Sequence, residues 1–383
     1  MNPQELVNQR LAPFEHEVAM LRPGGPALDA HTHLGLDEDG MTLDPGTLLE
    51  QMDVAGVEHA FTFPLHDPER HPAYSVPNDR VLRWAAESDG RLLPFCRLDP
   101  GDDPIGEAER CLAAGARGIK LHPRAQAFDM VHSGVVDIFA LAEQAQVPIL
   151  IHAGRGLPET FGPELVEIAQ RYPGASLILA HMGVADQGAL AMGLRDHPGV
   201  VYDSSWFNPI DAYALLSRVP AERLVFGSDP PYGRPFTGLL HILRLAASLG
   251  LAADTVRGIM GGTAAAMLEG RPLPPAGPPP APAVVNIDSR LARVHSQILM
   301  AFGCAFVAPD QARWIVEGAM AVCRDPDPGP AQAALERMRP LLEGALVLFE
   351  AGERRPGLSL LVPALIVSAT EVPQRLPAEV PQV

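Results

Sequence analysis

Short apolar runs alternate with longer stretches of helical periodicity along residues 27–250 of this chain. The apolar runs predict eight strands, at 27–31, 59–63, 92–97, 118–122, 148–152, 176–181, 200–203 and 224–226. The periodic stretches predict helices at 45–54, 78–88, 105–114, 135–144, 163–172, 185–196, 211–217 and 237–249. Strands that alternate with helices pair in parallel through right-handed crossovers, and eight such units predict a (β/α)8 barrel of the α/β class. A doubly wound open sheet is the alternative, but no G-x-G-x-x-G motif opens a helix here.

The segments that flank the barrel pattern predict three further regions. Residues 1–26 carry an amphipathic stretch broken at Pro13, which predicts one or two helices packed outside the barrel. The barrel would span 27–271, and the proline-rich stretch 272–283 predicts an extended linker and a domain boundary. Residues 284–383 are predicted to be mainly helical, with amphipathic segments at 287–302, 309–322 and 330–350. They carry no recognisable motif, and homo-oligomerisation and covering of the barrel mouth are both open as their role.

Composition and charge restrict the partners of the chain. A hydrophobic fraction of 47% and a charged fraction of 20% are typical of a globular protein. The net charge of −17 argues against nucleic acid and anionic membrane surfaces, because both attract basic faces. The apolar run 358–369 is interrupted by Pro363 and is shorter than the roughly 20 residues of a membrane span. Without a signal-peptide pattern or a C-x-x-C spacing, we expect a cytoplasmic protein with reduced cysteines.

Two imidazoles one residue apart close the first predicted strand. Side chains alternate between the two faces of a strand, so His31 and His33 point to the same side. Two histidines on one face can bind one metal ion, although an H-x-H pair taken alone is as often without metal.

Further polar residues stand at the ends of other predicted strands. Lys120 lies at the end of the fourth strand and His152 at the end of the fifth. His181 closes the sixth strand, and Asp229 follows the eighth. In a barrel the carboxyl ends of all strands meet at one mouth, so these side chains become neighbours. A lone histidine after a strand is usually structural, but this recurrence predicts a metal site.

Lys120 is the single lysine among the 29 lysine and arginine residues. Where any cation would serve, this sequence has arginine, so the one lysine suggests chemistry that a guanidinium cannot perform. Such chemistry includes loss of the proton, action as a compact ammonium group, and carboxylation. Chance retention of one lysine is the alternative.

At these motifs the sequence resembles the amidohydrolase superfamily, and most closely its amidohydrolase-related branch of metal-dependent barrel hydrolases and decarboxylases. The matching stretches are Asp-x-His-x-His at 29–33, Gly-Ile-Lys-Leu-His-Pro at 118–123, Ile-His-Ala-Gly at 151–154, Ala-His-Met-Gly at 180–183 and Gly-Ser-Asp-Pro at 227–230. Each stretch is weak alone, but their joint order and spacing are specific. The resemblance covers residues 27–270 and leaves out the C-terminal region.

The resemblance implies a set of metal ligands for a divalent ion, with Zn²⁺ favoured: His31, His33, His152 and Asp229. It places His181 beside the ion, as a group that polarises the substrate or acts as acid and base. Three neutral imidazoles and one carboxylate leave a Zn²⁺ site net positive, which lowers the pKa of a bound water toward about 7. Asp229 can accept the proton of that water and return it to the leaving group.

Lys120 distinguishes one bound ion from two. In binuclear members of the superfamily a lysine on the fourth strand is carboxylated and bridges the ions, and His152 and His181 would then hold the second ion. In the branch that this sequence most resembles, one ion is usual, and Lys120 would be a cation that pairs with a substrate carboxylate or carbonyl. One ion is therefore the favoured expectation.

Cationic residues near the predicted mouth indicate the kind of substrate. Arg97 follows the third strand, His122 and Arg124 follow the fourth, and Arg155 follows the fifth. Around a cationic metal they would suit an acidic or carbonyl-bearing small molecule. Surface ion pairs are the alternative for each of them.

Two reactions suit such a site. The first hypothesis is a hydrolase, in which metal-activated water attacks an ester, lactone or amide carbonyl while His181 and Lys120 stabilise the developing oxyanion. The second is a non-oxidative decarboxylase, a lyase that uses the same single-metal site without attack by water. The Lys-Leu-His-Pro and His-Met-Gly stretches favour hydrolysis. A non-catalytic barrel is the third hypothesis, and a complete ligand set argues against it.

Overall fold

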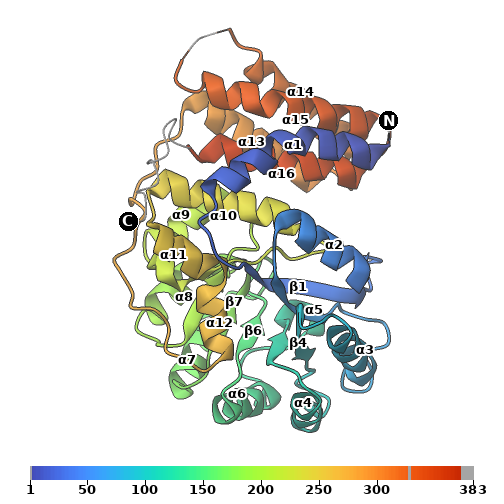
Figure 1. Cartoon of the computed structure of the whole chain (residues 1–383), viewed down its shortest axis with the longest axis vertical. Helices are drawn as coiled ribbons and strands as arrows, with labels where there is room; N and C mark the ends of the chain where they lie inside the picture. The colour runs from blue at the N-terminus through green and yellow to red at the C-terminus, as the bar shows by residue number, and fades with distance from the viewer. Residues whose placement is uncertain (1, 327–328, 372–383) are drawn as a thin grey trace.

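The computed structural model describes residues 2–326 and 329–371, and a closed barrel forms its larger part (Figure 1). The barrel strands are β1 (Leu28–Leu36), β3 (His59–Pro64), β4 (Leu92–Arg97), β5 (Gly118–Leu121), β6 (Ile149–Ile151), β7 (Leu177–Leu179), β8 (Val200–Asp203) and β9 (Leu224–Val225). A short strand, β2 (Thr42–Leu43), pairs antiparallel with the end of β1. The barrel strands are parallel neighbours in chain order from β1 to β9, as repeated right-handed crossovers require.

Backbone hydrogen bonds between β1 and the segment after β9 close the barrel. The amide of Ala30 donates to the carbonyl of Phe226 at 2.8 Å, and the amide of Asp229 donates to the carbonyl of His31 at 2.8 Å. The predicted (β/α)8 barrel is confirmed. Closure also brings the last strand of the barrel beside the first, so that Asp229 lies next to the His31–His33 pair.

Helices surround the barrel, and every helix predicted between the strands is present, with ends that differ by a few residues. They are α2 (Pro45–Ala55), α3 (Ser75–Ala86), α4 (Pro104–Ala113), α6 (Ser133–Ala145), α7 (Phe161–Arg171), α8 (Gln187–Gly193), α9 (Pro209–Leu216) and α10 (Pro235–Leu249). Shorter helices are α5 (Pro123–Gln126), α11 (Ala253–Arg257) and α12 (Thr263–Leu268). Caps define where helices begin: the Asp44 side chain accepts from the amide of Thr47 at 3.0 Å at the start of α2.

Side chains fill the barrel, so it is a packed core below the site rather than a channel. The rings of Phe61 and Phe95 stack there with centroids 4.7 Å apart. Leu150, Ile178 and Val201 from the following strands complete the same buried cluster. This rigid interior fixes the strand ends that carry the candidate site.

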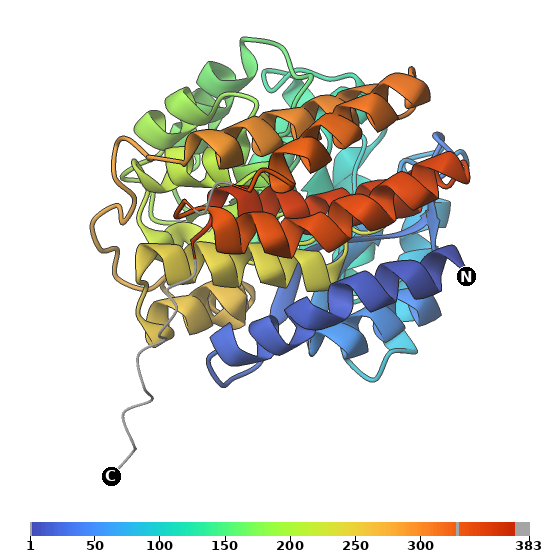
Figure 2. The same ribbon diagram turned by 90° about the horizontal axis from the view of Figure 1, so that it is seen from above.

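Four helices of the C-terminal region pack with the N-terminal helix along one side of the barrel (Figures 1 and 2). They are α13 (Ser289–Cys304), α14 (Pro309–Cys323), α15 (Gln332–Glu350) and α16 (Arg354–Ala369), joined by α1 (Pro3–Leu21). Helices α1 and α16 rest on α10, and one continuous apolar core links these helices to the barrel. We call α1 and α13–α16 the bundle. Among the described residues, no helix is both long and apolar enough to cross a membrane.

Two bundle helices differ from the sequence prediction at a proline. Helix α1 continues through Pro13, where a break was expected, and α16 continues through Pro363 and was not predicted. A proline inside a helix costs about 3 kcal/mol. In α1, burial of Leu11, Phe14 and Val18 outweighs that cost, because each large apolar side chain contributes roughly 1.5 to 3 kcal/mol.

A buried ion pair connects three parts of the molecule. The Glu17 carboxylate of α1 accepts hydrogen bonds from Arg244 of α10 and from Arg337 of α15. The Arg244 guanidinium also donates to the carbonyl of Thr370, just after α16, at 2.7 Å. This network fastens α1 and the end of α16 to a barrel helix.

Candidate metal centre

The first strand aims two imidazoles at one point. The register of β1 against β3 shifts between Asp29 and Thr32, and such a bulge re-aims the side chains around it. The Nε2 atoms of His31 and His33 lie 3.2 Å apart. The buried Asp29 carboxylate accepts from the amides of His31 and Ser228, each at 3.0 Å, and so ties β1 to the residue before Asp229. Burial raises the pKa of Asp29 to about 7.

Asp229 completes a group of three donors. Its Oδ1 lies 3.3 Å from His31 Nε2 and 3.2 Å from His33 Nε2. Ligand atoms placed tetrahedrally around Zn²⁺ at 2.0 to 2.1 Å are about 3.3 to 3.4 Å apart. The spacing of the three donors therefore fits one Zn²⁺-sized ion with no rearrangement. The backbone of Asp229 is left-handed, with φ of 57°, as strained residues at functional sites often are.

Asp203, at the end of β8, orients the first ligand. His31 Nδ1 donates to Asp203 Oδ2 at 2.7 Å, which leaves the lone pair of His31 on Nε2, toward Asp229. Burial alone would raise the pKa of Asp203, but interactions with His31, His181 and Ser205 hold it well below the ordinary value. Asp203 is not among the predicted site residues, although it closes a predicted strand as several of them do. That position was the available signal.

A second line of imidazoles starts from the same carboxylate. Ser205 Oγ donates to Asp203, so its oxygen accepts from His181 Nδ1 at 2.8 Å. His181 Nε2 then lacks a proton and accepts from His152 Nδ1 at 3.0 Å. This order of donors leaves a lone pair on His152 Nε2, which is buried and has no hydrogen-bond partner among the described residues. Ser205 is a further residue that the sequence analysis missed.

Burial favours the neutral form of His33, His152 and His181. Burial lowers the pKa of His181 to about 4, and burial and neighbouring cations lower those of His33 and His152 well below the usual value. The His122 ring stacks on His152 with centroids 3.8 Å apart, and burial lowers its pKa too. Neutral imidazoles are the form that binds metal. At Gly154 a β-carbon would lie 2.8 Å from both His152 and His181, so this close approach requires glycine.

The structure brings His31, His33 and Asp229 together and places His152 beside His181 instead. His152 does not belong to the three-donor group with Asp229. A second group, made by His31, His181 and Asp203, shares His31 with the first. In that group His31 Nδ1 and Asp203 Oδ2 are 2.7 Å apart, closer than tetrahedral ligands of Zn²⁺, so its geometry fits a hydrogen-bonded relay better than a ligand set.

Lys120 lies directly against this centre. Its Nζ is 3.5 Å from His31 Nε2 and 4.6 Å from the centre of the Phe63 ring. Burial lowers the pKa of Lys120 to about 7, and nearby Asp229 opposes the shift. No carboxylate forms an ion pair with it among the described residues. The amine is therefore available to a ligand.

Arg97 is a buried cation without a carboxylate partner in the described part of the chain. The residue is 1% exposed. Its guanidinium donates to the carbonyl of Pro64 at 3.2 Å and to the Gln126 side chain at 3.3 Å, and it lies over the Tyr74 ring. Burial lowers its pKa. A buried guanidinium that meets only neutral groups has capacity for an anion.

The other predicted cations stand farther out. Arg124 and Arg155 are exposed, and Arg155 stacks over the Trp206 ring at 4.9 Å.

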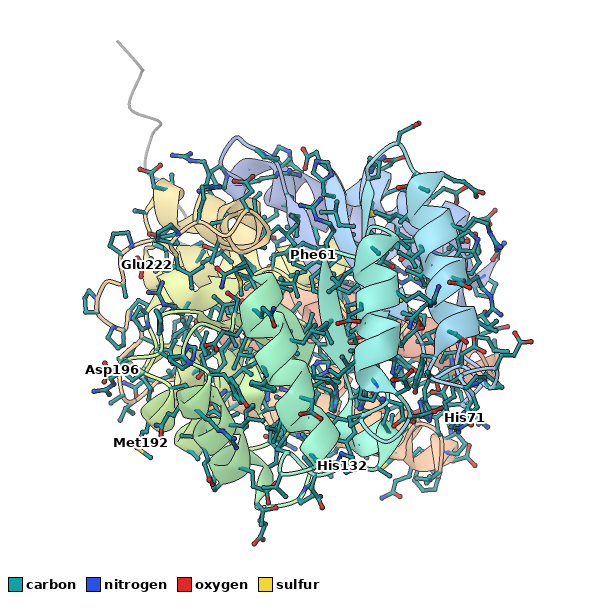
Figure 3. All side chains as sticks on the ribbon, turned by 90° about the horizontal axis from the view of Figure 1, so that it is seen from below. Phe61, His71, His132, Met192, Asp196 and Glu222 are labelled. Atoms are coloured by element: carbon teal, nitrogen blue, oxygen red, sulfur yellow. The ribbon has the colours of Figure 1, made fainter. Side chains whose placement is uncertain are left out.

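Figure 3 shows which edge of the barrel is the mouth. His71, after β3, and His132, before α6, lie toward one edge, and Glu222, before β9, lies toward the other. The edge with His71 and His132 is the mouth.

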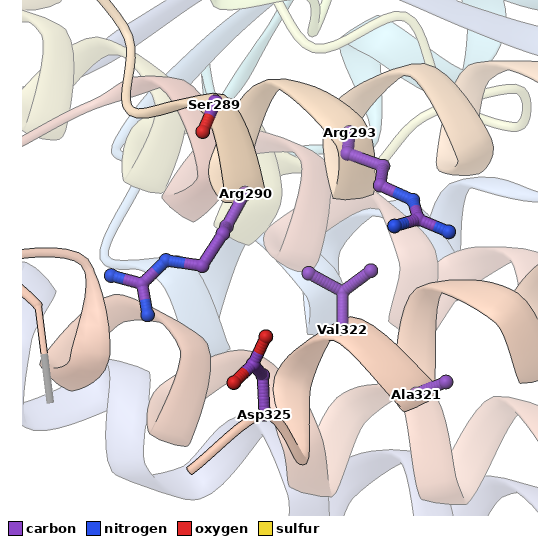
Figure 4. A pocket seen from close by; sticks show the side chains of 6 residues that line it. All are labelled: Ser289, Arg290, Arg293, Ala321, Val322 and Asp325. Carbon is purple, nitrogen blue, oxygen red and sulfur yellow. The ribbon is translucent and has the colours of Figure 1, made fainter. Parts of the chain in front are cut away.

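A pocket also opens on the bundle, between α13 and the end of α14 (Figure 4). Its lining residues are Ser289, Arg290, Arg293, Ala321, Val322 and Asp325. None of them is a predicted site residue, and the pocket lies away from the strand ends. The candidate site is therefore the barrel mouth.

Comparison with known proteins identifies the barrel. A family model described as amidohydrolase matches residues 28–270, from the first residue of β1 to just beyond α12. The chain belongs to the amidohydrolase family. This confirms the resemblance found in the sequence, and the match covers more than half of the chain.

Solved structures show that other proteins share the amidohydrolase barrel. An uncharacterized TIM-barrel protein from Bordetella bronchiseptica is 14% identical, with a TM-score of 0.52 over 64% of this chain and 99% of that one. The IDCase of Metarhizium anisopliae is 16% identical, with a TM-score of 0.51 over 64% of this chain and 98% of that one. At these identities the likeness shows the fold alone. No curated protein matches this amidohydrolase in sequence.

The role of Asp203 in this chain can be tested by metal binding. We expect Asp203→Asn to weaken Zn²⁺ affinity about 10- to 100-fold, as loss of a carboxylate behind a ligating histidine does. The reason is that His31 loses the acceptor that fixes its tautomer. Competition with a chromogenic chelator measures the affinity, and Asp53→Asn on the surface of α2 is the matched control. An unchanged affinity would show that Asp203 does not orient the ligand.

Proposed function

We propose that this chain is a metal-dependent hydrolase, in which metal-activated water attacks an ester, lactone or amide carbonyl. The observation that carries the proposal is the spacing of His31 Nε2, His33 Nε2 and Asp229 Oδ1, which are 3.2 to 3.3 Å apart at the ends of β1 and β9. Membership of the amidohydrolase family supports an enzyme that acts on a small molecule.

His31, His33 and Asp229 would hold one divalent ion, with Zn²⁺ favoured by two imidazoles and a carboxylate. His152, the fourth predicted ligand, lies outside this group of three donors; its buried Nε2, which has no hydrogen-bond partner among the described residues, keeps it a candidate for the fourth position. A Zn²⁺ ion in such a site acidifies water toward a pKa of about 7 and polarises a carbonyl oxygen.

The residues around the ligands suit the movement of protons. Asp229 presents a second carboxylate oxygen, which can accept a proton from the attacking water and pass it to the leaving group. His181 is held by Ser205 through Nδ1. To act as acid or base at the substrate, its Nε2 would exchange the hydrogen bond from His152 for one to the substrate. Lys120 stands against His31 without a carboxylate partner and can stabilise negative charge on the carbonyl oxygen.

We propose one ion for each chain and an unmodified Lys120. The second donor group is supported less well, because His31 Nδ1 and Asp203 Oδ2 are 2.7 Å apart and make a hydrogen bond. An unmodified amine at Lys120 keeps the centre net positive. Together with buried Arg97, and with Arg124 and Arg155 at the rim, this charge favours an acidic substrate; His122 lines the same side.

Metal content and turnover test the proposal together. Protein purified without added metal should contain about one Zn²⁺ per chain, and its intact mass under gentle conditions should be that of unmodified Lys120. It should hydrolyse some members of a panel of aryl esters and lactones, with a lower KM for carboxylated esters than for their neutral counterparts. Dipicolinate should abolish turnover, and added Zn²⁺ should restore it.

The competing outcomes are distinct. Carbon dioxide release from aromatic or unsaturated carboxylic acids, without ester turnover, would make the chain a decarboxylase that uses the same site. Two ions per chain with a carbon dioxide adduct on Lys120 would contradict the single-ion assignment. Metal-free protein with no turnover would favour a non-catalytic barrel.

A further inference from the structure

The segment between β8 and α9 connects the candidate site to the bundle. We call residues 204–208 the β8–α9 loop. It begins directly after Asp203, contributes Ser205 to the relay behind His31 and His181, and ends at Asn208, the cap of α9. A loop at this end of a barrel strand is where specificity is usually set. Its conformation depends on contacts from both the barrel and the bundle.

One side of this loop faces the mouth. The Arg155 guanidinium lies over the Trp206 ring, with its central carbon 4.9 Å from the ring centroid. Trp206 Nε1 donates a hydrogen bond to Asp211 Oδ2 at 2.5 Å. The pair therefore combines an apolar surface with a positive charge, and Arg155 follows His152 by three residues. Such a surface is suited to holding an acidic substrate with a planar or apolar body.

The other side of the loop faces the bundle. Phe207 stacks on Trp206 with ring centroids 5.7 Å apart, and its other neighbour is Phe302 of α13, at 5.6 Å. Phe207 and Phe302 both pack against the apolar core that joins the bundle to the barrel, whereas Trp206 packs against the separate core between the barrel and its outer helices. Phe302 lies outside the region matched by the family model, whereas the loop lies inside it.

From the barrel side, Trp206 is held by its hydrogen bond to Asp211 and by packing against the apolar core. From the other side its neighbour is Phe207, which lies outside any helix or strand. The rings of Phe302, Phe207 and Trp206 thus form a continuous row from α13 to the mouth. Aromatic pairs of this kind contribute beyond the area that they bury, and they favour defined ring orientations.

We propose that Phe302 is a positioning residue for the substrate site: through Phe207 it holds Trp206 under Arg155, so that the bundle sets substrate affinity without contacting the reacting atoms. The effect on substrate rests on the proposed function, whereas the effect on Trp206 does not. This inference gives the C-terminal region a role that neither oligomerisation nor covering of the mouth provides.

Fluorescence tests the link without a substrate. In a Trp84→Phe/Trp314→Phe background, Trp206 is the single tryptophan. We expect Phe302→Ala to increase iodide quenching of Trp206 about twofold or more, because a loop that loses its packing opens more often. Met300→Ala, at an exposed residue of the same helix, is the matched control, and Phe302→Tyr should restore the parent value.

Kinetics test the consequence for the site. With the carboxylated aryl ester that the parent hydrolyses best, Phe302→Ala should raise KM about fivefold and change kcat less than about twofold. Zn²⁺ content should equal that of the parent. A fall in kcat or Zn²⁺ content with KM unchanged would place the effect at the metal centre and overturn the assignment to substrate affinity.

The remaining outcomes also support or overturn the positioning role of Phe302. Unchanged quenching in folded Phe302→Ala would overturn the proposal. If that variant does not fold, as judged by circular dichroism, Phe302→Leu replaces it under the same criteria, because leucine keeps apolar volume but removes the ring. If the parent shows no turnover, the proposed function fails, and the quenching of Trp206 alone supports or overturns the positioning role.

Discussion

Replacing Asp229 by Asn is expected to lower kcat/KM by about 10³-fold, within the range that a general acid–base group supplies. The change keeps the shape of the side chain and removes its charge. It takes from the centre both its one carboxylate ligand and the proposed proton acceptor. The neutral amide oxygen of Asn is a weaker metal ligand than a carboxylate and a poor proton acceptor, so Zn²⁺ content should fall as well.

The measurement combines Zn²⁺ content with turnover of the best ester found for the parent. Asp53→Asn is the matched control, because it makes the same chemical change on an exposed face of α2, where Asp53 pairs with Arg91. Wild-type turnover in Asp229→Asn would contradict the assigned role. Retained Zn²⁺ with lost turnover would assign Asp229 to proton transfer and leave His31 and His33 as the principal ligands.

The grouping of these residues followed from the sequence because it depends on one rule of the fold. Parallel strands of a barrel present their carboxyl ends at a single mouth, so His31, His33 and Asp229 had to be neighbours once the strands were recognised. The strands were recognisable because each contains a short, mainly apolar run between loop residues. The position of Lys120 beside His31 follows from the same rule.

The finer geometry could not be deduced, because it depends on hydrogen-bond partners far apart in the chain. The donor order that runs from Asp203 through Ser205 and His181 to His152 links the ends of three strands, and periodicity does not encode it. The bundle shows the same limit. Pro363 reads as a break in sequence, yet α16 continues through it because the residues around it are buried in the bundle core.

The largest expected effect on stability is at Glu17, whose carboxylate is shared by Arg244 and Arg337. Replacing Glu17 by Leu leaves Arg244, which is 4% exposed, as a buried charge with only the polar groups of Thr370 to contact. Removing one partner of a buried ion pair costs about 3 to 5 kcal/mol of the free energy of unfolding. We expect a loss of that size in urea denaturation.

A second variant separates the ion pair from simple loss of packing. Glu17→Leu/Arg244→Met removes both buried charges and should recover most of the stability, because an apolar pair of similar volume is often as stable as a buried ion pair. Arg337→Met is the control: its side chain is 43% exposed, so it should cost less than about 1 kcal/mol. If Glu17→Leu alone costs no more than Arg337→Met, the pair does not hold the bundle on α10.

Two spectroscopic signals, followed during the same urea denaturation, show whether the bundle unfolds with the barrel. Fluorescence of Trp314, as the single tryptophan of a Trp84→Phe/Trp206→Phe background, reports on α14, and circular dichroism reports on the whole chain. Because one apolar core joins α1 and α13–α16 to the barrel helices, the two transitions should coincide in the parent. In Glu17→Leu the Trp314 transition should come first, since the lost ion pair is the polar link between α1, α10 and the end of α16. Coincident transitions in that variant would assign the coupling to the apolar core alone.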